Sequence, residues 1–386
     1  MDINLEQIGK RSIDDILELE ERYQRDFGCK PFNLSLWDAA KPFQVSLLER
    51  LELPLCTNLM NYEFSDLLNC RDEIIKRFGY NTSVSDCLIT PTGSISILCV
   101  LNWLQNIGIK KLHVLCPCYY TIIPLCKKFG IKTQKIFLTK TGKGFELEGM
   151  WAKTLANSKA IWLDNPIYCT GVTLSENIIE YLRNFLEQGG IVITDECLAP
   201  LGTELGRRLG DYPFFIGIHC PHKLLLMNSL KFSTIVFDRK YQHFFKYWSD
   251  VIYGSLLTSN IIAIEHFLSK NFDLLYKQSL IMILRSLENV RNVFKPFDSF
   301  FILDRSLGHL ISGYMPSLNS SFGDNKEFLW KVFRNSGTSF IPGTRYFFNP
   351  EGGFCFKINL ARDNEIFRAS LKILLNYLDK SYSMAI

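Results

Sequence analysis

Val192-Ile193-Thr194-Asp195-Glu196 places a carboxylate at the end of an apolar run, and His219-Cys220-Pro221-His222-Lys223 places an amine 28 positions after Asp195. The apolar runs that precede Asp195 and Lys223 have the composition of buried strands. An acid at the end of one strand and an amine at the end of the next form the pair that a pyridine aldehyde cofactor requires. The amine condenses with the aldehyde, and the acid keeps the pyridine nitrogen protonated, so that the ring can accept the electrons of a carbanion.

Asp195 needs a cationic partner, because a carboxylate at the end of an apolar strand is costly to bury alone. A protonated pyridine nitrogen supplies one, and a structural ion pair is the alternative.

Short β-rich runs alternate with segments of helical period from about residue 87 to 240. This alternation predicts an α/β fold, in which a mainly parallel seven-stranded sheet lies between helices. One of these helices is expected after Ser175 as N-cap and before Gly189-Gly190. The predicted strands are residues 87–90, 112–116, 132–137, 160–164, 191–195, 214–218 and 233–238.

The pattern changes beyond Tyr253, where an apolar-periodic stretch reaching about Val293 predicts a long helix or a helix pair that links domains. Strand-like runs and a final helix then predict a small α+β domain; they are residues 299–303, 338–341, 355–360 and 365–378. Residues 13–27 have helical period, and the N-terminal segment is expected to pack onto the small domain. The predicted divisions are an N-terminal segment (1–45), a large cofactor-binding domain (46–270) and an interdomain helix with the small domain (271–386).

The composition favours an ordinary enzyme of 386 residues, of which 47% are hydrophobic. Lys and Arg (43) nearly balance Asp and Glu (39), without basic blocks, so neither nucleic acid nor a membrane surface is expected as a partner. No targeting segment or membrane span of ~18 apolar residues is seen, which predicts a cytoplasmic location. The 12 cysteines are expected to be reduced, and the one close pair, Cys116-Pro117-Cys118, lacks the paired CxxC spacing of a metal centre, so no metal site is predicted.

Two further motifs follow strands. In Thr90-Pro91-Thr92-Gly93-Ser94-Ile95-Ser96 a strand turns through a glycine into an apolar helix, so backbone N–H groups and the positive helix end face an anion such as a cofactor phosphate. An ordinary strand-to-helix turn is the alternative. Tyr119 follows the run 112–116, where its ring could stack on a pyridine face or simply fill the edge of the core.

In this order, the motifs resemble those of the fold-type I pyridoxal-phosphate (PLP) enzymes, specifically the class I/II aminotransferase superfamily, over nearly the whole chain. The resemblance implies a PLP-transferase fold with PLP as cofactor, Lys223 as the Schiff-base lysine and Asp195 at the pyridine nitrogen. It also implies that Tyr119 stacks on the ring and that the phosphate is held by Gly93, Ser94 and Ile95.

Residues 164–171, Asp-Asn-Pro-Ile-Tyr-Cys-Thr-Gly, resemble the Asn-Pro-x-Asn-Pro-Thr-Gly turn of the family, with Tyr168-Cys169 in place of the second Asn-Pro. In the family that second asparagine hydrogen-bonds the phenolic oxygen of the cofactor. Here Tyr168 could donate instead, or Asn165 could take the place. Leu198 stands where the family usually has a tyrosine that reaches the same oxygen.

The phosphate site departs from the family as well. Cys220 stands where a phosphate-binding serine is usual, and Lys231 stands where an arginine is usual, which keeps the charge but loses the bidentate fork. His222 could hydrogen-bond phosphate or substrate, or be a packed histidine. Lys231 is also the rival of Lys223 as the nucleophile, but it begins a strand and is less suitably placed.

Two residues concern substrate and partner. Lys357 occupies the position of the arginine that clamps the substrate α-carboxylate in the family, and an ammonium cannot grip a carboxylate with a planar fork. Tyr62 in Asn61-Tyr62-Glu63 resembles the tyrosine that reaches the phosphate of the neighbouring subunit, which implies a homodimer. An ordinary tyrosine at a helix start is the alternative.

The sequence therefore predicts a PLP-dependent enzyme that binds an amino acid or related amine as an external aldimine, with an aminotransferase as the first expectation. The substitutions at the site leave a specialised lyase, cyclase or oxidase as the alternative. A homologue that keeps the fold without turnover is the third hypothesis.

Overall fold

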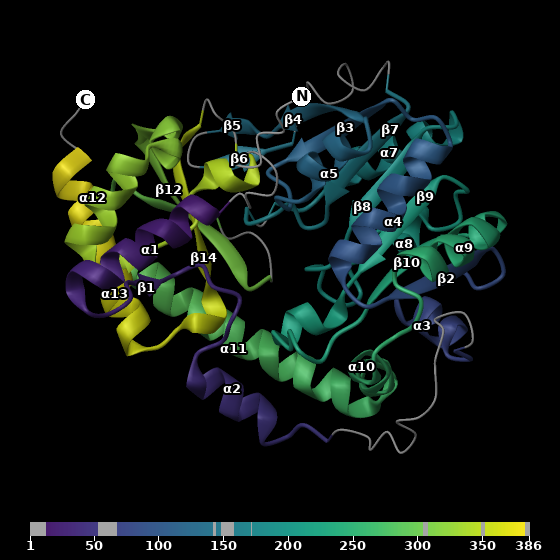
Figure 1. Ribbon diagram of the computed structural model, residues 1–386, viewed down its shortest axis with the longest axis horizontal. Coiled ribbons are helices and arrows are strands. Elements are labelled where there is room, and N and C mark those ends of the chain that lie inside the picture. Colours follow the sequence, from purple (N-terminus) through teal and green to yellow (C-terminus); the bar gives the residue numbers. More distant parts are fainter. Residues whose placement is uncertain are drawn as a thin grey trace, which may run out of the picture.

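The structure is a computed structural model, and it describes residues 13–52, 68–141, 144–147, 158–170, 172–303, 308–348 and 352–382. Figure 1 shows two parts of the molecule side by side: a large part, which contains a large sheet and its helices, and a smaller part made of strands and helices. The long helix α11 (Lys270–Phe294) packs against elements of both parts.

A seven-stranded sheet forms the large part, with the strand order β2-β10-β9-β8-β7-β3-β4. Only β10 runs antiparallel to its neighbours. The prediction of a mainly parallel seven-stranded sheet is confirmed. The strands are β2 (Ser85–Thr90), β3 (Lys111–Cys116), β4 (Lys132–Phe137), β7 (Ala160–Asp164), β8 (Ile191–Asp195), β9 (Phe215–His219) and β10 (Ser233–Asp238).

Helices cover both faces of this sheet, because successive side chains of its central strands are buried on opposite faces. Val192 belongs to one hydrophobic core and its neighbour Ile193 to the other, so each face of β8 is packed against helices. The helices of the large part are α3 (Arg71–Arg77), α4 (Gly93–Asn106), α5 (Ile122–Lys128), α7 (Glu176–Glu187), α8 (Gly206–Leu209), α9 (Gln242–Ile252) and α10 (Thr258–Leu268).

The predicted boundaries of α7 and of the linking segment agree with the structure. Ser175 is the N-cap of α7, and five apolar side chains between Ile178 and Leu186 are buried on one side. The stretch beyond Tyr253 is a helix pair, α10 followed by α11. Short 3-10 helices are η2 (Pro221–Leu225), η3 (Arg239–Tyr241), η4 (Ser320–Asp324), η5 (Gly343–Tyr346) and η6 (Leu360–Arg362).

The small part is built on an antiparallel sheet with the order β11-β12-β14. Its strands are β11 (Phe301–Leu303), β12 (Leu310–Asn319) and β14 (Gly353–Asn359), and its helices are α12 (Lys326–Ser336) and α13 (Glu365–Tyr382). The sequence did not predict β12 and α12. Gly313 and Pro316 interrupt the alternation of β12, and the pairing with β14 shifts register after Met315.

The N-terminal segment packs on the small part. Helix α1 (Asp14–Phe27) contacts α12, and β1 (Phe32–Asn33) pairs in parallel with β13 (Thr338–Ser339). The chain then continues into α2 (Lys41–Leu48), which lies along the lower edge with α11 (Figure 1). A hairpin of β5 (Thr139–Thr141) and β6 (Gly144–Glu146) completes the described strands. None of the described helices combines the length and hydrophobicity needed to cross a membrane.

Candidate active site

Acidic and basic side chains meet where the parallel strands end. Asp164 and Asp195 are directly paired in register at the ends of β7 and β8, and the short helix η2 after β9 carries Lys223. The Lys223 ammonium lies 5.2 Å from the ring centre of Tyr119 and 5.7 Å from that of Trp37. These side chains line one pocket, whose residues are Trp37, Tyr119, Asp164, Pro166, Tyr168, Asp195, Cys197, Leu198 and Lys223.

The two carboxylates are held by backbone N–H groups. The N–H of Cys197 donates to Asp195 Oδ1 at 3.1 Å, and the N–H of Tyr119 donates to Asp164 Oδ2 at 3.1 Å. Burial, and after it the charge of Asp195, raises the pKa of Asp164 well above its ordinary range. The Oδ1 atom of Asp164 has no hydrogen-bond partner among the described residues.

The surroundings of Lys223 favour its charged form. Burial alone would lower the pKa of this amine, but the negative charge that Cys197, Cys220 and Asp195 can carry outweighs burial, and the pKa is raised. Cys197 and Cys220 form a thiol pair, in which a hydrogen bond from Cys197 lowers the pKa of Cys220 to about 7. The amine of Lys223 thus lies in a region of negative potential between two strand ends.

The predicted phosphate loop begins α4 beside this pocket. Thr92 caps the helix by accepting the N–H of Ile95 at 3.3 Å. A Cβ atom added to Gly93 would lie 3.6 Å from both Lys223 Nζ and Cys197 Sγ, so the loop and the lysine are neighbours. The hydroxyl of Ser94 interacts with Tyr119 and lowers the pKa of that phenol, against the larger effect of burial.

Buried hydrogen bonds hold the loop that precedes α4 in place. The hydroxyls of Thr90, Ser96 and Ser233 form a buried chain with distances of 2.7 and 2.9 Å. The amide of Asn260 donates to the carbonyls of Pro91, at 3.2 Å, and Lys231, at 2.6 Å. The charge of Lys231 contributes to lowering the pKa of the nearby Cys220 thiol.

Comparisons with known proteins were made in sequence and in structure. No protein-family model matches the sequence, and no curated protein matches it. Solved structures match over nearly the whole chain. A methionine aminotransferase, YbdL from Escherichia coli, is 14% identical with a TM-score of 0.76, covering 97% of this chain and 99% of its own.

Two further solved structures also match over nearly the whole chain. An aromatic aminotransferase from Pyrococcus horikoshii is 13% identical with a TM-score of 0.73, covering 94% of this chain and 99% of its own. A double mutant of the Thermus thermophilus aspartate aminotransferase is 13% identical with a TM-score of 0.75, covering 97% of this chain and 99% of its own.

The chain has the fold of the class I aminotransferases. At identities of 12–17%, this likeness establishes the fold-type I architecture and not the activity. The predicted resemblance and fold class are confirmed at that level.

The donor set of the pocket fits a phosphorylated pyridine aldehyde. An amine, a carboxylate and an aromatic ring converge at the strand ends, and a helix N-terminus lies next to them. The unpartnered Oδ1 of Asp164 adds a buried polar atom that no described residue satisfies. Lys223, Asp195, Tyr119 and the loop at Gly93 are the residues that could hold such a group.

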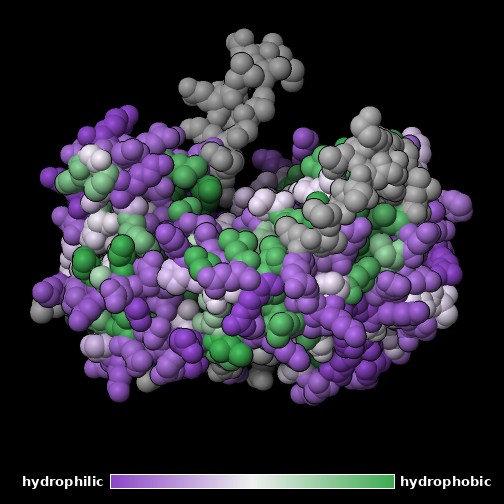
Figure 2. Space-filling view, turned by 90° about the horizontal axis from the view of Figure 1, so that it is seen from below, coloured by the Kyte–Doolittle hydropathy of each residue, from purple (hydrophilic) through white to green (hydrophobic). Residues whose placement is uncertain are grey.

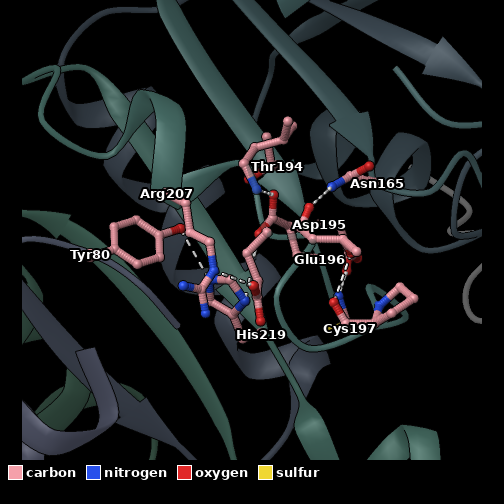
Figure 3. A network of polar contacts seen from close by, with 12 residues as sticks. Tyr80, Asn165, Thr194, Asp195, Glu196, Cys197, Arg207 and His219 are labelled. Atoms are coloured by element: carbon pink, nitrogen blue, oxygen red, sulfur yellow. Dashed lines mark hydrogen bonds and ion pairs between the residues drawn. The ribbon is translucent and has the colours of Figure 1, made fainter. Parts of the chain in front are cut away.

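Tyr168 and Asn165, the two residues predicted as alternative partners of the cofactor's phenolic oxygen, point in different directions from the turn that carries them. Tyr168 lines the pocket, with its ring centre 6.1 Å from that of Tyr119. Asn165 is directed elsewhere: its amide donates to the carbonyl of Thr203 at 3.3 Å, and its backbone N–H donates to the carbonyl of Asp195 at 3.0 Å (Figure 3). The structure therefore brings Tyr168, and not Asn165, to the pocket.

His222 is buried in an apolar cluster behind Lys223. Its ring lies 5.3 Å from that of Phe272 and 5.6 Å from that of Phe232, and its Nε2 lies 3.3 Å from Nδ1 of His266. Burial, together with His266, lowers its pKa to about 3, so it is neutral. This environment matches the packed-histidine alternative.

Lys357 lies on β14 beside Trp37, and its ammonium is 5.0 Å from the centre of that indole ring. The residue is only 2% exposed, and burial lowers its pKa to about 8. The indole of Trp37 thus lies near the ammonium groups of both Lys357 and Lys223. Tyr62 lies outside the described residues.

Asp164 and Trp37 are among the pocket residues that were not predicted as site residues. Asp164 carries the same signal as Asp195, an acid at the end of an apolar strand, and could have been found by it. Trp37 comes from the N-terminal segment, which has no local pattern that points to the site. Trp37 also lines a separate, larger cavity of about 790 Å³, whose other lining residues lie mainly on α2 and in the segment after η2.

A second layer of polar side chains supports the ends of β8 and β9 (Figure 3). The hydroxyl of Tyr80 is 3.0 Å from Nε2 of His219, and the N–H of Leu205 donates to Glu196 Oε1 at 2.8 Å. Burial raises the pKa of Glu196 to about 8 and lowers that of His219 to about 3. Both are therefore neutral near pH 7, and their 3.7 Å contact is not an ion pair.

Proposed function

We propose that this protein is a PLP-dependent enzyme that acts on an amino acid, and that its reaction is transamination. The observation that carries the proposal is the convergence of Lys223, Asp195 and Tyr119 on one pocket at the carboxyl edge of the sheet. When bound, PLP supplies an electron sink for a carbanion at the substrate α-carbon.

The residues of the chain take the remaining roles. Asp195 holds a proton on the pyridine nitrogen, and the ring of Tyr119 keeps the cofactor flat against the strand ends. The N-terminus of α4 and Lys231 hold the phosphate. Lys223 moves the proton at the substrate α-carbon as a general base held by proximity.

We further propose a homodimer. Helices α2 and α11 carry exposed apolar side chains, namely Val45, Leu48, Leu274, Ile281 and Leu284. Figure 2, seen from the side on which these helices lie, shows apolar residues gathered among polar ones. Sedimentation of the purified protein tests this proposal, and a monomer at micromolar concentration contradicts it.

Covalent trapping tests the cofactor assignment. The protein is incubated with PLP, reduced with borohydride and digested, and the modified peptide is identified by mass spectrometry. We expect the adduct on Lys223, its loss in Lys223→Ala and its retention in Lys231→Ala. A protein that takes up no cofactor, or an adduct on Lys231, contradicts the proposal.

The reaction type is tested with a panel of amino acids. Conversion of the bound cofactor to its amine form, followed by absorbance, supports transamination. Release of ammonia and a keto acid without an acceptor would instead assign elimination.

A further inference from the structure

His309 is a buried histidine whose side chain makes no hydrogen bond to the described residues. It immediately precedes β12, is only 2% exposed, and neither of its ring nitrogens has a partner among the described residues. The large majority of buried polar side-chain atoms in proteins are hydrogen-bonded, and an exception needs an explanation such as a ligand. An imidazole always offers at least one N–H donor.

The neighbours of His309 are cationic. Its ring lies edge-on to Trp37 with the centres 5.9 Å apart, and the same indole has Lys357 Nζ at 5.0 Å and Lys223 Nζ at 5.7 Å. Burial and the charges of these two lysines lower the pKa of His309 to about 3. Three nitrogen-bearing side chains from separate elements therefore surround one indole ring.

No carboxylate in the described part of the chain forms an ion pair with Lys357. The group that acts on its charge is the thiol of Cys169, and its contact with Trp37 is a cation–π contact. A buried ammonium without a counter-ion is unfavourable, and an anionic ligand would compensate it. Lys357 thus lacks a counter-ion and His309 lacks a hydrogen-bond partner among the described residues, and both side chains lie near the indole of Trp37.

We propose that His309 and Lys357 together bind the carboxylate of the substrate, which makes His309 a specificity-determining residue. The ammonium supplies charge and the imidazole N–H supplies a second, directional donor, which matches the two oxygens of a carboxylate. This inference rests on the proposed function, in which the substrate amine meets the cofactor at Lys223, whose ammonium lies near the same indole ring. The substrate class is then an amino acid and not a simple amine.

Ligand binding to the PLP-supplemented protein tests this site. Phenylacetate is the probe, phenylacetamide is its neutral counterpart, and dissociation constants are measured by calorimetry for the original chain, His309→Leu and His309→Gln. We expect the carboxylate to bind at least about tenfold more tightly than the amide. Loss of one hydrogen bond to a charged group in His309→Leu should weaken the carboxylate about tenfold, whereas His309→Gln, which keeps a donor, should lose much less.

The amide should bind His309→Leu and the original chain equally, which separates loss of the donor from misfolding. Equal carboxylate binding by His309→Leu and the original chain, or no preference for the carboxylate, overturns the inference. Cofactor absorbance is recorded on the same samples. A coloured protein without carboxylate preference contradicts only His309, and a colourless protein that still prefers the carboxylate contradicts only the proposed function.

Discussion

The region proposed to hold the cofactor (the cofactor side) and the region proposed to hold the substrate carboxylate (the substrate side) differ in how far their polar groups find partners within the protein. On the cofactor side, backbone N–H groups hold Asp164 and Asp195, and a chain of hydroxyls fixes the loop before α4. On the substrate side, His309 is buried with both ring nitrogens unpartnered among the described residues, and Lys357 is buried there without an ion pair to a carboxylate. On the cofactor side one carboxylate oxygen, Oδ1 of Asp164, is left without a partner among the described residues, whereas on the substrate side both ring nitrogens of His309 are.

This difference follows from how each side is assembled. The cofactor side lies at the ends of adjacent parallel strands, whose ladder fixes Asp164 opposite Asp195. The substrate side is brought together from the N-terminal segment, the start of β12 and the middle of β14. We therefore expect mutations on the cofactor side to affect the chemical step and mutations on the substrate side to affect binding.

The largest effect is expected from Asp195→Asn. Loss of the charge that holds the pyridine nitrogen protonated should lower the rate of cofactor conversion by about 10²- to 10³-fold, the magnitude typical of losing one preorganised electrostatic contact. The rate is measured by stopped-flow absorbance with the most reactive amino acid of the panel. Asp211→Asn, at an exposed position, is the matched control. A rate for Asp195→Asn within threefold of the control contradicts the role of Asp195.

Lys357→Met, on the substrate side, should affect substrate binding. Removing the ammonium should raise KM for the amino acid about 10- to 100-fold, since a hydrogen bond to a charged group contributes about 1.5–3 kcal/mol. The cofactor spectrum and its retention on dialysis should not change. If Lys357→Met loses the cofactor instead, the division between the two sides is wrong.

The pH dependence sharpens the same comparison. Burial lowers the pKa of Lys357 to about 8, so the amine is charged below that pH and loses its charge above it. We expect kcat/KM to fall by up to about tenfold per pH unit above pH 8, because this parameter reports the free enzyme. Lys357→Arg, whose guanidinium stays charged, should remove the fall. An unchanged profile in Lys357→Arg would assign the titration to another group.

Much of the cofactor side was predictable from the sequence, because its residues follow strands with a clear apolar pattern. Asp195 and Lys223 are 28 positions apart, and the alternation of strands and helices between them leaves few possible arrangements. The choice between Asn165 and Tyr168 was not predictable, because it depends on how one turn directs two neighbouring side chains.

The substrate side could not be predicted in the same way. Trp37 and His309 meet only because β1 pairs with β13 and β12 pairs with β14, and these contacts join segments far apart in the chain. His309 lies before a strand that has no regular alternation. A lone histidine in such a segment carries no signal until the tertiary structure shows that its nitrogens are buried without partners.

The smallest effect is expected on the pH dependence of the free energy of unfolding, through Glu196 in the polar layer that supports the ends of β8 and β9. Burial raises the pKa of Glu196 from 4.5 to about 8, so between these values the folded chain holds a proton that the unfolded chain has released. Stability should therefore fall as pH rises through this window, by up to about 1.4 kcal/mol per pH unit, and level off above pH 8. Glu196→Gln cannot ionise and should flatten this part of the curve.

Urea unfolding at pH 5.5, 7 and 8.5 measures this difference, with Glu21→Gln at an exposed position of α1 as the control. Glu196→Gln can still accept the N–H of Leu205, so it should be more stable than the original chain at pH 8.5 and nearly equal at pH 5.5. Parallel curves for the two chains would mean that Glu196 is ionised in the folded protein. His219 would then have to be its charged partner, and the layer that supports Asp195 would be an ion pair.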